Sequence, residues 1–136
     1  MRDQNRKSAT AFAPASVGNV GVGFDILGHT VAALGDKVRA ARRAEPGVAI
    51  RSITGTVENL PLAADKNTAG MAVLAMCREL GLPYGFDLDI EKGIPLGSGL
   101  GGSAASAVAG IVAATALVDV PLDRTELLKF AMQGEA

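Results

Sequence analysis

The sequence predicts an α+β fold in which a mixed or antiparallel sheet packs against helices. Its 136 residues are enough for one domain with a sizeable core. Apolar residues make up 49% of the chain and charged residues 20%, a balance typical of globular proteins. Strand and helix signals are mixed irregularly along the chain, which favours α+β over a repeating strand–helix–strand array.

The first half of the chain contains three candidate strands. The first covers residues 8–13 and ends before a proline. Residues 36–43 and 48–53 are predicted as two further strands, separated by a turn at Pro46 and Gly47. Because only this short turn divides them, we expect these two strands to form a hairpin.

A helix and a fourth strand are predicted next. The helix begins at Asn67 or Thr68 and ends at Gly81, a residue that commonly terminates helices. In residues 86–92 apolar and acidic side chains alternate, which predicts a strand with one buried and one solvated face. The apolar members of this strand are Phe86, Leu88 and Ile90, and the acidic members are Asp87, Asp89 and Glu91.

Two helices are predicted in the last part of the chain. Residues 103–118 are strongly apolar and small, as in a fully buried helix. Asp123 and Glu126 have the spacing of a capping box for a last helix, which we expect to run to about Met132.

Charge, hydropathy and cysteine content argue against several classes of protein. The formal net charge is −1 and basic residues are scattered, so no nucleic-acid partner is predicted. The apolar run at residues 103–118 is short for a membrane span and contains polar residues, so no membrane association is predicted. The single cysteine, Cys77, cannot form an internal disulfide, which favours a cytoplasmic protein. Its apolar helical neighbours indicate a core residue rather than a reactive thiol.

The stretch PLGSGLGGSAAS, residues 95–106, lies between a predicted strand and a predicted helix. Such a turn presents backbone N–H groups and the positive end of a helix to an anion, which indicates a phosphate-binding loop. It lacks the lysine of a Walker A loop. Gly97, Gly99 and Gly102 match the dinucleotide pattern GxGxxG, with Asp119 downstream, but Pro95 and the alternating strand fit that motif poorly. A glycine turn that only packs a helix onto a sheet stays an alternative.

A second unusual stretch is FAPASVGNVGVGFDILG, residues 12–28. It places Ser16, Asn19 and Asp25 among small and apolar neighbours, an arrangement typical of a small-ligand site. Capping of local turns by Asn19 and Asp25 is the alternative interpretation.

The glycine-rich stretch resembles the signature loop of the GHMP family of small-molecule kinases. The match holds at Pro95, Gly97, residues 99–101 and residues 103–105, and it departs at Gly102, where the family usually has a serine. Residues 12–28 are more similar to the N-terminal motif of the homoserine kinases within this family. DKNTAG at 65–70 and GEA at 134–136 agree with them too, so the likeness covers about residues 11–136.

The resemblance implies a fold and an activity. The fold is the two-layer GHMP N-terminal domain, which is similar to some ribosomal protein domains, over residues 1–136, with the C-terminal GHMP domain absent from this chain. The activity is ATP-dependent phosphorylation of the side-chain hydroxyl of L-homoserine to O-phospho-L-homoserine, a step of threonine biosynthesis, and we expect the fragment alone to be inactive. A homodimer is a candidate assembly. A mevalonate-type kinase and a non-catalytic domain with this fold are the alternatives.

The resemblance also implies roles for individual residues. Asn19 and Asp25 would bind the substrate, and Asn67 and Lys92 would lie near the adenosine of ATP. Ser103 and Glu135 would hold Mg²⁺, which prefers hard oxygen ligands, although Ser103 could equally cap its helix. Catalytic roles fall to Asn19, Ser103 and Glu135, and no general base is identified. The phosphates would be wrapped by Pro95, Leu96, Gly97, Ser98, Gly99, Leu100, Gly101, Gly102, Ser103, Ala104 and Ala105.

Overall fold

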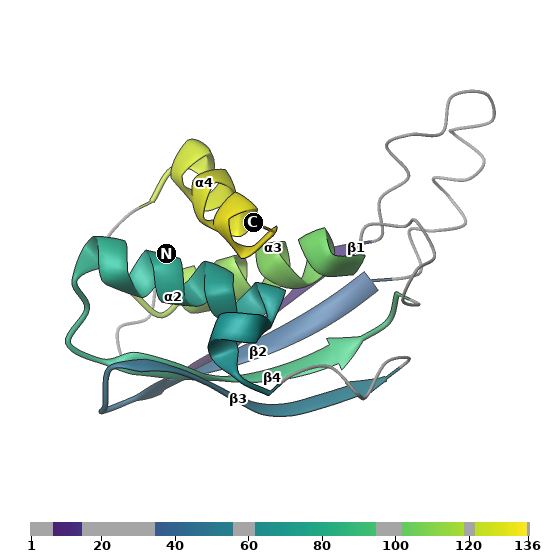
Figure 1. Cartoon of the computed structure of the whole chain (residues 1–136), viewed down its shortest axis with the longest axis horizontal. Helices are drawn as coiled ribbons and strands as arrows, with labels where there is room; N and C mark the ends of the chain where they lie inside the picture. Colours follow the sequence, from purple (N-terminus) through teal and green to yellow (C-terminus); the bar gives the residue numbers. More distant parts are fainter. Residues whose placement is uncertain (1–6, 15–34, 56–61, 95–101, 119–121, 136) are drawn as a thin grey trace.

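A computed structural model describes residues 7–14, 35–55, 62–94, 102–118 and 122–135. Within these ranges, four strands form one mixed sheet in the order β1-β2-β4-β3, and three α-helices lie on one face of it (Figure 1). The predicted α+β class is therefore confirmed. The elements are β1 (Ser8–Pro14), β2 (Gly35–Arg43), β3 (Gly47–Gly55), the short 3-10 helix η1 (Ala64–Lys66), α2 (Thr68–Leu80), β4 (Gly85–Lys92), α3 (Gly102–Thr115) and α4 (Arg124–Glu135).

The predicted hairpin between β2 and β3 is wrong, because β4 lies between these two strands. β4 pairs antiparallel with β2 and parallel with β3. Its inward side chains, Phe86, Leu88 and Ile90, are at most 2% exposed, and burial this complete favours a central place in the sheet. The chain can return parallel to β3 because η1 and α2 form a crossover between β3 and β4.

The alternation predicted for β4 is confirmed, and β2 shows the same pattern. On the inner face, Val38 and Ala40 of β2 lie under the helices with the apolar residues of β4. On the outer face, basic residues of β2 pair with acidic residues of β4. These pairs are Lys37–Glu91, with 4.0 Å between Nζ and Oε2, and Arg39–Asp89, with 3.6 Å between Nη1 and Oδ2.

α2 begins and ends where the sequence predicts. Asn67 is its N-cap, and Gly81 takes a left-handed conformation with φ of 60° at its C-terminal end. α2 packs closely on α3, because the contact is made by small residues, among them Ala69 and Gly110. Cys77 is buried in this layer, as predicted.

The last two helices differ slightly from their predicted bounds. α3 ends at Thr115 rather than at residue 118, because the N–H groups of Leu117 and Val118 bond to carbonyls three residues back and tighten the chain into turns. The capping box of α4 is confirmed: the Glu126 N–H donates to Asp123 Oδ1 at 2.8 Å. α4 continues to Glu135, beyond the predicted end near Met132. In the part of the chain that the structure describes, no helix combines the length and apolarity needed to cross a membrane.

Candidate functional site

The attachment points of both unusual sequence segments lie at one end of the sheet. Pro14, the last residue of β1, pairs with Gly35, the first residue of β2. Lys92, the last residue of β4, pairs with Gly55 at the end of β3. Residues 15–34 join β1 to β2, and residues 95–101 lie between β4 and α3. Because Lys37 near the start of β2 pairs with Glu91 near the end of β4, both segments begin at the same end of the sheet.

A buried polar cluster lies at this end, between the sheet and α3. We call Asp36, Lys92 and Ser106 the Asp36 cluster; all three are at most 5% exposed. The Lys92 ammonium forms an ion pair with Asp36 Oδ2 and also donates to Ser106 Oγ at 2.7 Å. Ser106 Oγ lies 2.7 Å from the same Asp36 oxygen and donates to it. The cluster therefore joins β2, β4 and α3 at a single point.

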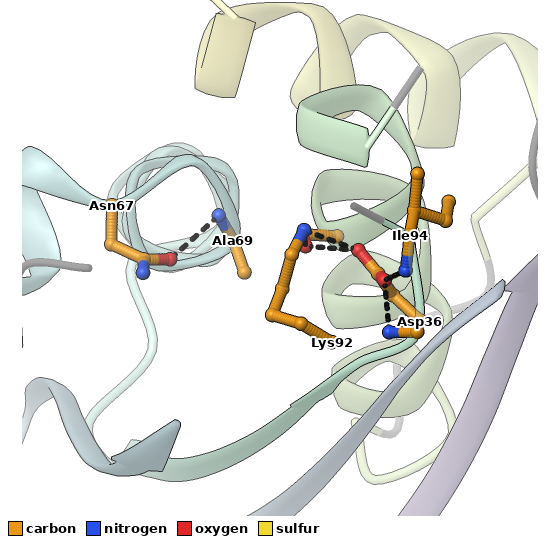
Figure 2. Close-up of polar contacts among 7 residues, drawn as sticks. Asp36, Asn67, Ala69, Lys92 and Ile94 are labelled. Atoms are coloured by element: carbon orange, nitrogen blue, oxygen red, sulfur yellow. Dashed lines mark hydrogen bonds and ion pairs between the residues drawn. The ribbon is translucent and has the colours of Figure 1, made fainter. Parts of the chain in front are cut away.

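The other oxygen of Asp36 holds the backbone just after β4. Asp36 Oδ1 accepts hydrogen bonds from the N–H groups of Gly93, at 2.9 Å, and Ile94, at 3.2 Å. Figure 2 shows Asp36 between Lys92 on one side and Ile94 on the other. A Cβ atom on Gly93 would overlap the carbonyl oxygen of Gly35, so this close approach of two strands requires glycine.

Asn67 lies at the N-terminus of α2 and is 6% exposed. Its Oδ1 accepts hydrogen bonds from the N–H groups of Ala69, at 3.0 Å, and Gly70, at 3.2 Å, and so caps the helix. In Figure 2 the Lys92 side chain points to Asp36 rather than to Asn67. The described contacts of Asn67 and Lys92 are thus structural, and their assignment to the adenosine of ATP stays a prediction.

The structure describes only some of the remaining predicted site residues. Ala105 is buried in α3. The backbone of α3 places Gly102, Ser103 and Ala104 at its start, and the backbone of α4 places Glu135 at its end, but these side chains lie outside the described part. The residues that fall wholly outside the described ranges are Asn19, Asp25, Pro95, Leu96, Gly97, Ser98, Gly99, Leu100 and Gly101.

Asp36 and Ser106 were not singled out from the sequence, although a signal for Asp36 exists. Asp36 lies two and four residues from the buried residues Val38 and Ala40, and so on the same face of its strand. Lys92 lies two residues from Ile90 and shares its buried face. Two opposite charges in phase with the buried faces of adjacent strands indicate a buried ion pair. Ser106 carries no such signal, because a serine in a helix of small residues is equally suited to packing.

The described residues include neither a reactive thiol nor a ready metal cluster. Burial raises the pKa of the Cys77 thiol to about 11, so this side chain is neutral at ordinary pH. Within the described ranges, no group of three or more His, Cys, Asp or Glu side chains is placed to hold a metal ion. The hydroxyl of Ser103 and the carboxylate of Glu135 are hard oxygen donors, so their chemistry fits Mg²⁺.

Known proteins with similar sequences and structures agree with the resemblance. The family model described as "GHMP kinases N terminal domain" matches residues 67–136. A homoserine kinase of Xylella fastidiosa (strain M12) is 56% identical over 128 residues, covering 94% of this chain and 40% of that protein. A homoserine kinase of Xanthomonas campestris pv. campestris (strain B100) is 52% identical over 130 residues, covering 96% of this chain and 40% of that protein.

The fold agrees as well. The crystal structure of a homoserine kinase from Cytophaga hutchinsonii ATCC 33406 matches with a TM-score of 0.83 and 38% identity, over 99% of this chain and 43% of that one. The chain thus spans about two fifths of the length of these relatives. Its sequence, its fold and the position of its glycine-rich segment agree, and the chain belongs to the GHMP kinase family, in the part that forms the N-terminal domain.

Proposed function

We propose that this chain is the nucleotide-binding part of a homoserine kinase, which transfers the γ-phosphoryl group of ATP to the side-chain hydroxyl of L-homoserine. One observation carries the proposal beyond family membership: the segments that contain the two ligand-binding motifs attach at the same end of the sheet. The two relatives described above, at 56% and 52% identity, are named homoserine kinases, and this supports the choice of substrate.

In this proposal, residues 95–105 bind the phosphates. The start of α3 at Gly102 follows the glycine-rich segment directly, so unpaired N–H groups at a helix N-terminus are available to an anion. Phosphoryl transfer depends chiefly on positioning and charge neutralisation, which this kind of loop supplies. Ser103 and Glu135 would hold Mg²⁺, whose contribution is to neutralise charge on the phosphate oxygens.

The proposed substrate contacts are Asn19 and Asp25. Homoserine carries an ammonium, a carboxylate and the reacting hydroxyl. The Asp25 carboxylate can accept hydrogen bonds from the ammonium or orient the hydroxyl, and the Asn19 amide can both donate and accept.

We assign the protein to the cytoplasm and expect it to form a homodimer. Light scattering of the purified protein would test the homodimer.

The activity is tested by supplying ATP and a panel of alcohols to the complete protein, meaning this chain with the second domain. We expect ADP to form with L-homoserine and not with mevalonate. ADP formation with mevalonate alone would make it a mevalonate-type kinase, and no turnover with any alcohol would favour a non-catalytic domain. The 136-residue chain spans about two fifths of the length of these relatives, so we expect it alone to turn over homoserine poorly.

The substrate contacts are tested with Asp25→Asn and Asn19→Ala, beside Asp89→Asn as a control on the outer face of the sheet. We expect the first two to lower kcat/KM for homoserine about ten- to a hundredfold, the effect of one lost hydrogen bond to a charged group. The affinity for ATP should stay nearly unchanged. Unchanged kinetics together with a lower melting temperature would mean that these residues only cap turns.

A further inference from the structure

We infer that Asp36 is a positioning residue that fixes both ends of the glycine-rich segment, holding Gly93 and Ile94 before it and α3 after it. The contacts of Asp36 stand on the described geometry alone. The consequence for nucleotide binding rests on the proposed function.

The two carboxylate oxygens of Asp36 accept hydrogen bonds from different parts of the chain. Oδ1 accepts from two successive backbone N–H groups, at Gly93 and Ile94, which are the last described residues before position 95. Oδ2 accepts from Ser106 on α3 and from the Lys92 ammonium. One side chain on β2 therefore ties the chain that leaves β4 to the helix that follows the glycine-rich segment.

The cluster requires a carboxylate on a side chain of the length of aspartate at position 36. Asp36 is 0% exposed, and a buried carboxylate needs hydrogen-bond donors around it. An asparagine would present an NH₂ group either to the Lys92 ammonium and the Ser106 hydroxyl or to the two backbone N–H groups. In the first case the NH₂ group would face the Lys92 ammonium, a donor against a donor. In the second case it would face the backbone N–H groups of Gly93 and Ile94, again a donor against donors. A glutamate would need room for one more methylene in a region where Gly35 and Gly93 already touch.

The position of the cluster separates this role from ordinary core stability. Its partners are the residues on either side of positions 95–101, whereas the apolar core extends over the whole sheet. Loosening the cluster should therefore change the spacing of the loop ends, and with it the affinity for phosphates, more than an equal loss of stability elsewhere would. Ordered geometry matters here because misplacement of a binding group by about 1 Å can cost on the order of a hundredfold in rate.

The test compares Ser106→Ala and Asp36→Asn with matched controls in the complete protein. Ser106→Ala removes one hydroxyl from the cluster and leaves the Asp36–Lys92 pair in place, so it stays informative if Asp36→Asn fails to fold. Ser52→Ala is its control, because Ser52 Oγ also donates to an aspartate, Asp89, at 2.8 Å, but on the outer face. Glu91→Gln is the control for Asp36→Asn, since Glu91 pairs with Lys37 one residue away on the same two strands. Ile50→Val supplies a core variant of reduced stability farther from the cluster, because Ile50 pairs with Leu88, four residues before Lys92 on β4.

Two quantities are measured: amide hydrogen exchange at Gly93 and Ile94, and the KM for ATP beside the KM for homoserine. We expect Ser106→Ala to accelerate exchange at both amides and to raise the KM for ATP about tenfold, with the KM for homoserine nearly unchanged. Ser52→Ala and Glu91→Gln should change neither quantity.

Three results would overturn the inference. If amide exchange at Gly93 and Ile94 is unchanged in both Ser106→Ala and Asp36→Asn, Asp36 does not hold this backbone. If the KM for ATP rises equally in Ile50→Val, at a matched loss of melting temperature, the effect of the cluster variants is one of stability alone. If exchange accelerates but the KM for ATP is unchanged, the coupling to the nucleotide is wrong although the contacts are right. A wild-type protein that binds no ATP in calorimetry would instead refute the proposed function, and the exchange comparison would still decide whether Asp36 fixes Gly93 and Ile94.

Discussion

Replacing Lys92 with methionine removes the cation of the Asp36 cluster while keeping an unbranched, apolar side chain of similar length. Asp36 would then keep its carboxylate, fully buried, with hydrogen bonds from Ser106 and two backbone N–H groups but without its ion-pair partner. Breaking one half of a buried pair is far more costly than breaking an exposed one, because the remaining charge cannot return to water.

The expected loss follows from this burial. Removing one partner of a buried pair costs about 3–5 kcal/mol of the free energy of unfolding, a large share of the roughly 5–15 kcal/mol typical of one domain. With an unfolding entropy of about 2.1 cal/mol/K per residue, a chain of 136 residues should lose roughly 10–17 °C in Tm. Lys37→Met is the matched control: its pair with Glu91 spans 4.0 Å and both side chains are more than half exposed. It should cost at most about 1 kcal/mol.

The assay is urea unfolding followed by far-ultraviolet circular dichroism, on Lys92→Met, Lys37→Met and the double variant Asp36→Asn/Lys92→Met. In the double variant the buried charge is gone. An asparagine oxygen can still accept from Gly93 and Ile94 while its NH₂ group donates to Ser106, so it should be more stable than Lys92→Met alone. If Lys92→Met costs no more than Lys37→Met, the pair is not desolvated, and Lys92 is available for a ligand as the family resemblance implies.

Three further predictions concern α2, the buried thiol and the loop end. Asn67→Ala should destabilise the chain by about 1 kcal/mol in the same unfolding assay, because two N–H groups lose their cap; an equal loss in Asn67→Asp, which retains the acceptor, would contradict this. Cys77 should resist iodoacetamide at pH 8 in the folded chain and react in urea, as judged by mass spectrometry. Because burial raises the pKa of its thiol to about 11 from 9.0, its contribution to stability is present below about pH 9 and is lost as the pH rises towards 11; rapid modification of the folded chain would count against it. Gly93→Ala should lower Tm more than Gly81→Ala, since a Cβ at Gly93 overlaps the Gly35 carbonyl whereas Gly81 has open space and only an unfavourable φ; equal melting temperatures would show that the strands can separate locally at no cost.

The parts of the fold that depend on neighbouring residues were predictable. The alternation in β4, the cap and stop of α2 and the capping box of α4 are all decided within a few positions of the chain. The order of the strands is not, because the place of β4 between β2 and β3 depends on which inward faces are most apolar and on the crossover through α2. Local turn signals at Pro46 and Gly47 therefore predicted a pairing that does not form.

The candidate site shows the same division. The glycine-rich segment was found from composition, whereas the Asp36 cluster is formed by residues 56 and 70 positions apart. Its only signal in the sequence is that Asp36 and Lys92 lie on the same strand faces as the buried residues around them. Lys92 was selected from the family resemblance, whereas its contacts with Asp36 and Ser106 were not expected from the sequence.

The central place of β4 also decides how this sheet can assemble on the ribosome. β1 and β2 can pair as soon as both have emerged, but the other edge of β2 must wait for a strand that begins at Gly85, and β3 has no partner before then. A nascent chain that ends before β4 therefore exposes an unpaired strand and an unpaired edge, the features that favour wrong intermolecular pairing. Pairing over such separations is slow, so we expect pauses in synthesis ahead of residue 85 to increase aggregation.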